Sequence, residues 1–128
     1  MPDDIGVISM VTKAVRGAIK VEDNRAMLIQ EASIRLMKEL ITRNSIAEMD
    51  VVSIIFSITK DLTRLNPATS LRSIGFHEIP LFCVQEAFIE GQHSRIIRVL
   101  LTFNADEEKT PQPVYLNGAE ILRPDLTA

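Results

Sequence analysis

Two kinds of hydrophobic pattern follow one another in the first third of the chain. Residues 10–21 (MVTKAVRGAIKV) are rich in β-branched side chains and alternate in polarity, which predicts a strand. Asp23 or Asn24 is then the predicted N-cap of a long amphipathic helix that ends at Asn44. Apolar residues recur at helical spacing within it and form one stripe: Ile29, Ala32, Leu36, Met37, Leu40 and Ile41.

A buried strand and a short helix are predicted next. Residues 51–58 (VVSIIFSI) form a nearly continuous apolar run bounded by polar residues, which is typical of a well-buried strand. Asn66 and Pro67 predict the start of a short helix, because Asn is a favourable cap and Pro is preorganised for the first helical position. Gly75 is expected to close this helix.

The last part of the chain is predicted to form strands and turns. Residues 79–89 and 95–103 are two apolar runs joined by the segment EGQHS, a length that suits a β-hairpin. Pro111 and Pro113 interrupt the chain before a last short strand, residues 114–116.

These elements predict an α+β fold in which one long helix lies on a mixed β-sheet. At 128 residues the chain is long enough for one core and too short for two, so residues 10–128 are expected to form a single domain after an N-terminal extension, residues 1–9. A single long helix covers only one face of such a sheet. The other face is therefore expected to be buried by a partner subunit.

Composition excludes several classes of function. The net charge of −3 argues against a nucleic-acid or anionic-membrane surface, because such partners require an excess of Lys and Arg. No apolar run approaches the roughly 20 residues that span a bilayer. The acidic N-terminus lacks the basic region of a signal peptide, so the expected compartment is the cytoplasm. One Cys and two His leave no credible zinc site.

The predicted hairpin brings two charged residues together. If Ile89 faces Arg95 across the loop, antiparallel pairing places Glu86 opposite Arg98 on one face of the sheet. Arg98 lies in the apolar run 96–101 (IIRVLL), where a charge is costly unless it is paired or solvated. Two interpretations stay open at this point: a structural ion pair on a solvent-facing sheet, or a site that binds an anion and needs a carboxylate beside it.

Five other side chains are weak candidates when each is taken alone: Arg16, Arg72, Arg123, Cys83 and Tyr115. The three arginines are typical surface cations, although Gly17 beside Arg16 permits the close approach of a ligand. Cys83 has no adjacent His that would make it a nucleophile. Tyr115 is equally consistent with a core residue that keeps a solvated hydroxyl.

Taken together, these residues resemble one family, the monofunctional AroH-type chorismate mutases. The resemblance runs from about residue 12 to residue 126, and no single motif in it is specific. Its value lies in the order and approximate spacing of six segments: Arg16-Gly17-Ala18, Pro67-Ala68 followed by Arg72, Pro80 with Cys83 and Gln85-Glu86, Ile97-Arg98-Val99, Val114-Tyr115-Leu116, and Leu122-Arg123-Pro124-Asp125-Leu126.

The resemblance implies a fold, an activity and an assembly. The expected assembly is a homotrimer of α+β subunits whose sheets form a pseudo-α/β-barrel, with active sites in clefts between neighbouring subunits. The expected reaction is the pericyclic rearrangement of chorismate to prephenate, on the way to phenylalanine and tyrosine, and it requires no cofactor and no metal.

The resemblance also implies roles for individual residues. Arg98 would lie near the ether oxygen and a carboxylate of the substrate, and Arg16 would bind a carboxylate. Glu86 and Cys83 would accompany the ring hydroxyl, and Tyr115 would complete that wall. The remaining implied contacts are Arg72 from the adjacent subunit, Arg123 from a mobile C-terminal tail that closes over the cleft, and the lining residues Ala68, Thr69, Leu81, Phe82 and Leu122.

Three positions depart from the family pattern. Asn66 stands where an aromatic residue is common, Thr69 where the best-known members carry a lysine, and Pro113 where a histidine is frequent. Two alternatives are kept. One is an enamine/imine deaminase of the RidA type, which has a similar trimeric subunit and also uses arginine for a substrate carboxylate. The other is a non-catalytic trimer that binds a carboxylate ligand, which only Asn66 and Thr69 support. The deaminase has no evident use for Arg16 and Arg98 together with Glu86.

Overall fold

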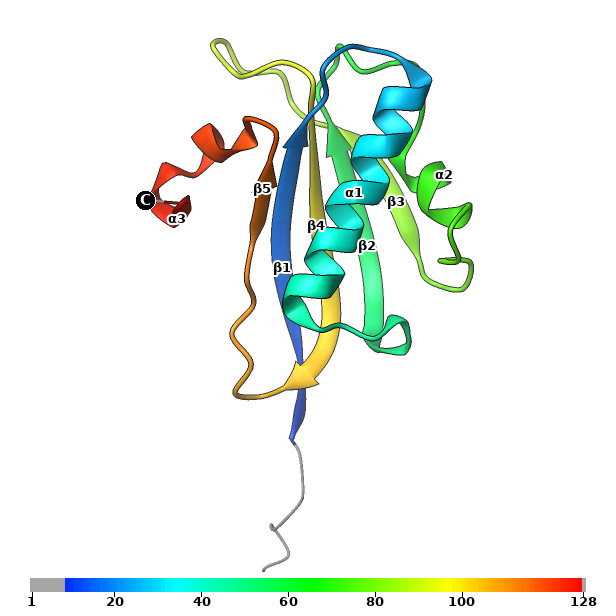
Figure 1. Cartoon of the computed structure of the whole chain (residues 1–128), viewed down its shortest axis with the longest axis vertical. Coiled ribbons are helices and arrows are strands. Elements are labelled where there is room, and N and C mark those ends of the chain that lie inside the picture. Colours follow the sequence, from blue (N-terminus) through cyan, green and yellow to red (C-terminus); the bar gives the residue numbers. More distant parts are fainter. Residues whose placement is uncertain (1–8, 128) are drawn as a thin grey trace, which may run out of the picture.

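The computed structural model describes residues 9–127, with side chains up to residue 125. The predicted N-terminal extension, residues 1–9, lies outside the described residues except for Ser9. One five-stranded mixed sheet has the order β3-β2-β4-β1-β5, and the long helix α1 crosses one of its faces (Figure 1). The elements are β1 (Met10–Lys20), α1 (Ala26–Asn44), η2 (Glu48–Asp50), β2 (Val51–Ile58), α2 (Pro67–Arg72), β3 (Leu81–Gln85), β4 (Ile96–Asp106), β5 (Val114–Leu116), η3 (Ala119–Leu122) and α3 (Pro124–Thr127). The predicted α+β class is confirmed.

Helix α1 ends where the sequence predicts but begins later. The prediction that Asp23 or Asn24 caps it is wrong, because the helix starts at Ala26 and has no side-chain cap. The Asn24 side chain instead forms two hydrogen bonds with Thr63. Nδ2 of Asn24 donates to the Thr63 hydroxyl at 2.9 Å, and Oδ1 of Asn24 accepts from the Thr63 backbone N–H at 3.0 Å. These bonds tie the β1–α1 connection to the segment after β2. The helix ends at Asn44, as predicted.

The core lies between α1, α2 and the sheet face beneath them. Five of the six residues in the predicted stripe of α1 are buried, and Ile41 is half-buried. They pack against alternate residues of the central strands, and each such side chain contributes about 1.5–3 kcal/mol when it is buried. The strand residues on this face include Val15, Ile19, Ile54, Phe56, Val99 and Leu101.

Gly17 illustrates how closely α1 approaches the sheet. Strand β1 pairs with β4 in continuous antiparallel register along its whole length, so Gly17 forms no bulge. A Cβ atom there would lie 3.0 Å from Leu40 Cδ1 and 3.1 Å from Leu36 Cδ1. A close approach is therefore present at Gly17, and helix α1 makes it.

The predicted hairpin does not exist. Strand β3 is parallel to β2, and β2 lies between β3 and β4. The predicted strand 79–89 is also shorter, covering Leu81–Gln85. The cause is the crossover that carries α2, since parallel neighbours require such a connection and α2 packs on α1 and returns the chain to the far side of β2. Asn66 caps α2 as predicted, by accepting a bond from the Ala68 N–H at 2.9 Å.

Helix α2 ends before the glycine that was expected to close it. Its last residue is Arg72 and its C-cap is Ser73, whereas Gly75, at φ +118°, turns the chain two residues later.

The sheet face opposite α1, here called the open face, is not covered in the same way. The bounds of β2 match the prediction, but its burial alternates, since Ile54 and Phe56 are buried whereas Val52 and Ile55 are 41% and 39% exposed. Within one chain, the prediction of a well-buried strand therefore holds only for the face of β2 that lies toward α1. No helix within residues 9–127 is long and apolar enough to cross a membrane.

Candidate active site

Arg98 and Glu86 meet on the open face. Arg98 lies on β4, opposite Ser57 of β2. Glu86 directly follows β3, where its N–H donates to the Ile58 carbonyl at 2.8 Å. Its Oε1 lies 2.9 Å from Arg98 Nε and accepts a hydrogen bond from Ser57 Oγ at 3.2 Å. The contact expected from the sequence is present, but it crosses the intervening strand β2 instead of a hairpin.

The surroundings of this pair leave it partly open to solvent. The side chain of Arg98 is 43% exposed and that of Glu86 is 21% exposed. Although Nε of Arg98 is close to the carboxylate, its N–H forms no aligned hydrogen bond with the described residues, so the contact is ionic. Nε makes the contact of 2.9 Å, and the guanidinium carries further donors on its two terminal nitrogens.

Arg16 joins the same face from the neighbouring strand. It lies opposite Leu100 in the β1–β4 register, two positions along β4 from Arg98. A hollow of about 230 Å³ lies between the two arginines, and its lining consists of Arg16, Ile55, Ser57, Arg98, Val99 and Leu100. Two cations above an apolar floor suit an anion that carries a hydrocarbon ring. Sequence reasoning missed Ser57, Ile55 and Leu100, which the alternation of β2 and β4 would have indicated once the register was known.

The C-terminal segment covers the end of the open face near β5. Tyr115 lies opposite Ala18 and therefore on the open face. Together with Leu122 it packs on a small cluster formed by Ala18, Ile96 and Ala119. This cluster is separate from the main core, and it positions the residues that follow η3 at the edge of the sheet beside β5 (Figure 1).

Arg123 is held by its neighbour Asp125. Its Nε and Nη2 donate to the two carboxylate oxygens at 3.1 and 2.8 Å. This hydrogen bonding raises the pKa of Arg123, with a smaller contribution from Tyr115, although burial acts in the opposite direction. The same contact lowers the pKa of Asp125 against the effect of burial, and the charge of Arg16 lowers it further. Arg123, Asp125 and Arg16 are therefore within electrostatic reach of one another.

A second hollow, of about 180 Å³, connects Arg16 with Arg123. Its lining also includes Ala14, Val15, Pro111 and Pro113. The two prolines belong to the connection between β4 and β5, and they form a wall beside the two cations.

The other candidates lie on the opposite side of the sheet. Helix α2, with Ala68, Thr69 and Arg72, packs against α1. Cys83 lies opposite Phe56 in the β2–β3 register, so it faces the α1 side and packs on the core. Burial raises the pKa of the Cys83 thiol, which is the state of an unreactive cysteine. Ala68 is itself buried, whereas Thr69 and Arg72 are exposed.

Strand β3 divides the remaining two candidates between the faces. Leu81 lies opposite Ile54 and packs on the core, whereas Phe82 lies opposite Ile55 on the open face and is 63% exposed. Within one chain, the candidates therefore form two groups. The open-face group is Arg16, Phe82, Glu86, Arg98, Tyr115, Leu122 and Arg123, and the helix-side group is Ala68, Thr69, Arg72, Leu81 and Cys83.

Comparisons with known proteins agree with one another. The family model described as "Chorismate mutase type I" matches residues 12–126. Chorismate mutase AroH of Thermus thermophilus is 38% identical over 121 residues, which cover 91% of this chain and 97% of the relative. Chorismate mutase AroH of Bacillus subtilis is 32% identical over 120 residues, covering 92% and 94%. A solved chorismate mutase from Clostridium thermocellum superimposes with a TM-score of 0.82 at 39% identity, covering 85% of this chain and 98% of that one.

Proposed function

Because the chain belongs to the type I chorismate mutase family and is a chorismate mutase, we propose that its active site is completed between the subunits of a homotrimer, with Arg98 as the central catalytic cation. The substrate is chorismate and the product is prephenate. The deaminase and non-catalytic alternatives receive no support from these relatives.

The observation that carries this proposal is the division of the candidates by the sheet. Arg98 and Glu86 lie on the open face, whereas Arg72 and Cys83 lie on the side of α1 and α2. A five-stranded sheet separates the two groups, so they cannot contact one small ligand within one chain. A second copy that brings its α2–β3 edge to the open face would unite them. The same contact would bury the exposed apolar residues Ile55, Val84 and Leu100.

The chemistry suits this set of residues. In the rearrangement an ether C–O bond breaks while a C–C bond forms within one molecule, so no nucleophile and no proton transfer are required. The enzyme must hold the reactive conformer and stabilise the negative charge that grows on the ether oxygen. Guanidinium groups can orient the two carboxylates of chorismate by paired hydrogen bonds. A fixed cation beside the ether oxygen acts mainly in the transition state, and it therefore lowers the barrier.

The expected lowering of the barrier is divided between the cation and the selection of the reactive conformer. One preorganised donor of this kind contributes about 3–4 kcal/mol, or roughly 10²–10³ in rate. An acceleration on the order of 10⁶ requires ~8 kcal/mol, so selection of the reactive conformer must supply the remainder. We assign the ether oxygen to Arg98 and the carboxylates to Arg16, Arg123 and the neighbouring subunit's copy of Arg72. Glu86 orients Arg98 and accepts the ring hydroxyl. The cytoplasm is the proposed compartment, as for a soluble biosynthetic enzyme of this class.

Mixed trimers test the shared site. Arg98→Gln and Arg72→Ala each impair every site of a homotrimer that contains only that variant. If each site takes Arg98 from one subunit and Arg72 from the next, refolding the two variants together at equal amounts restores both residues in about a quarter of the sites. Chorismate consumption, followed by its ultraviolet absorbance, should then exceed that of either variant alone.

A matched mixture serves as the control. Arg98→Gln combined with Glu86→Gln should recover nothing, because both residues come from the open face of the same subunit. Light scattering should give the mass of a trimer throughout. Absence of recovery in the first mixture, with subunit exchange verified by mass spectrometry, would contradict the shared site, as would an active monomer.

A further inference from the structure

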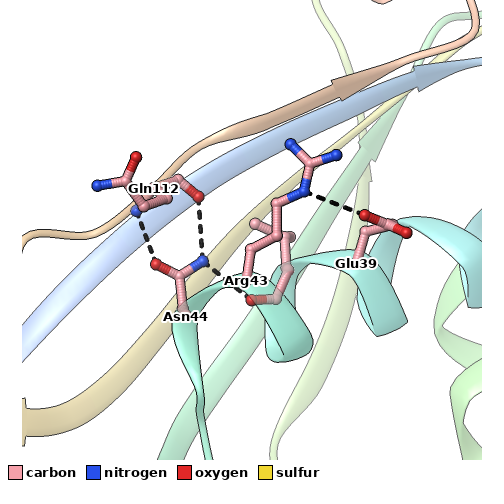
Figure 2. A network of polar contacts seen from close by, with 5 residues as sticks. Glu39, Arg43, Asn44 and Gln112 are labelled. Atoms are coloured by element: carbon pink, nitrogen blue, oxygen red, sulfur yellow. Dashed lines mark hydrogen bonds and ion pairs between the residues drawn. The ribbon is translucent and has the colours of Figure 1, made fainter.

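Asn44 connects the end of α1 to the segment between β4 and β5 (Figure 2). It is 1% exposed, and its carboxamide is fully engaged. Oδ1 accepts a hydrogen bond from the Gln112 backbone N–H at 2.6 Å, and Nδ2 donates to the Gln112 carbonyl at 3.0 Å. Nδ2 also donates to the Leu40 carbonyl at 2.9 Å. The side chain thus pairs with Gln112 as a neighbouring strand would.

The sequence around Gln112 makes this contact important. Pro111 and Pro113 have no backbone N–H, so Gln112 carries the only backbone donor of these three residues. Asn44 takes up that donor and the carbonyl of the same residue. The regular pairing of β5 with β1 begins only at Val114, opposite Gly17. Asn44 is therefore the anchor of the proline segment immediately before β5.

Two lysines hold the beginning of the same connection. Lys13 Nζ donates to the carbonyls of Glu107 and Lys109, at 2.7 and 2.6 Å. Lys109 Nζ in turn donates to the backbone carbonyl of Asn44. These contacts fix residues 107–109, but none of them reaches the prolines. The position of the prolines depends on the carboxamide of Asn44.

The anchored prolines form a wall of the hollow between Arg16 and Arg123. A shift of the segment would change the width of that hollow and the path of the chain into Tyr115. We propose that Asn44, which touches no reacting group, is a positioning residue that sets the carboxylate-binding part of the active site through Gln112. This inference rests on the proposed roles of Arg16 and Arg123.

The variants Asn44→Ala and Asn44→Asp test it by separating KM from kcat. Both abolish the donor to Gln112, and the second keeps an acceptor. For Asn44→Ala we expect KM to rise about 10-fold, less than the ~100-fold that a misplacement of ~1 Å can cost. The kcat should change little, because Arg98 on β4 lies two strands away from the segment and Glu86, at the end of β3, lies four strands away. For Asn44→Asp, KM should move toward the wild-type value as the pH falls and the introduced carboxyl gains a proton that it can donate.

Two controls separate positioning from stability. Ile29→Val lowers stability at the other end of the same helix and should leave KM unchanged, since Ile29 does not contact the proline segment. Gln112→Ala should also leave KM unchanged, because Asn44 bonds only the backbone of Gln112. All assays are run well below the melting temperature of each variant.

The outcomes are distinguishable. A folded Asn44→Ala variant with the wild-type KM overturns the inference, and so does a KM for Asn44→Asp that is raised but does not depend on pH. If Asn44→Ala does not fold, the pH profile of Asn44→Asp decides alone. Arg16→Ala is measured in parallel. A raised KM for Arg16→Ala with no effect at Asn44 removes only this inference, whereas no effect of Arg16→Ala contradicts the proposed function itself.

Discussion

The two faces of one sheet differ in almost every property, although the same strands build both. On the α1 side, residues such as Val15 and Val99 are buried against the helix. Their immediate neighbours on the same strands, Arg16 and Arg98, point to the open face. Because successive side chains of a strand point to opposite faces, one segment can contribute stability on one side and binding groups on the other. Substitutions on the two faces should therefore have separable effects.

The largest expected effect concerns the open face. Replacement of Arg98 by citrulline keeps the shape and several donors of the side chain but removes its charge. We expect kcat to fall by roughly 10²–10³ while KM rises much less, because the charge acts mainly on the developing ether oxyanion. Stability should change modestly, since Glu86 keeps hydrogen-bond donors nearby. A folded trimer with near-normal kcat would make Arg98 a structural residue.

A substitution on the α1 face should reverse this pattern. In Gly17→Ala the added methyl group would lie 3.1 Å from the Val114 carbonyl oxygen as well as against Leu36 and Leu40. The backbone of Val114 cannot move aside as easily as a flexible side chain can. We therefore expect the free energy of unfolding to fall by about 1–3 kcal/mol. Urea denaturation measures this loss. The kcat of the folded variant should stay close to the wild-type value. A marked fall in kcat of the folded variant would show that the two faces are coupled.

The smallest expected effect concerns Asp61, whose side chain bonds the backbone just before β4 and belongs to neither face of the sheet. The Asp61 carboxylate accepts the Arg95 N–H at 3.0 and 3.2 Å, at a residue whose φ is +54°. Burial would raise the pKa of Asp61, but bonding to Thr59 and Arg95 outweighs it and the pKa is lowered. A lowered folded-state pKa means that ionised Asp61 stabilises the fold above its unfolded-state pKa, and that this contribution is lost as the pH falls through the folded value.

Asp61→Asn should therefore cost about 1 kcal/mol of unfolding free energy at neutral pH and less in acid. Chemical denaturation at pH 7 and at a pH well below 3.8, the ordinary pKa of an Asp side chain, makes the comparison. A difference from wild type that stays constant with pH would argue against a role for the charge. The kcat should be unaffected if the register of β4 is set mainly by its two neighbouring strands.

The sequence predicts local elements of this protein better than their partners. The bounds of β2 and β5 and the end of α1 follow from apolar runs and from Asn44. The pairing of β3 does not follow from the sequence. The short segment between β3 and β4 suggests that these two strands pair, and it does not reveal that β2 lies between them. The crossover through α2 decides that pairing by packing on α1.

The candidate site shows the same limit. Arg98 and Glu86 were placed together by an incorrect hairpin, and they meet because both happen to flank β2 on one face. Strand alternation alone separates Cys83 from Glu86, but the assignment of each to a particular face required the register of β3 against β2. The contact of Asn44 with Gln112 joins residues far apart in sequence, and no local pattern indicates it.

The order of the strands in the sheet also constrains how the chain can be made. Strand β1 is the first to leave the ribosome, yet its two neighbours, β4 and β5, are the last strands to be synthesised. Until then β1 has free hydrogen-bonding edges on both sides, which is the condition that invites association between nascent chains. Helix α1 can shield only the apolar face of β1 during that interval. The sheet can therefore be completed only after β4 and β5 have left the ribosome.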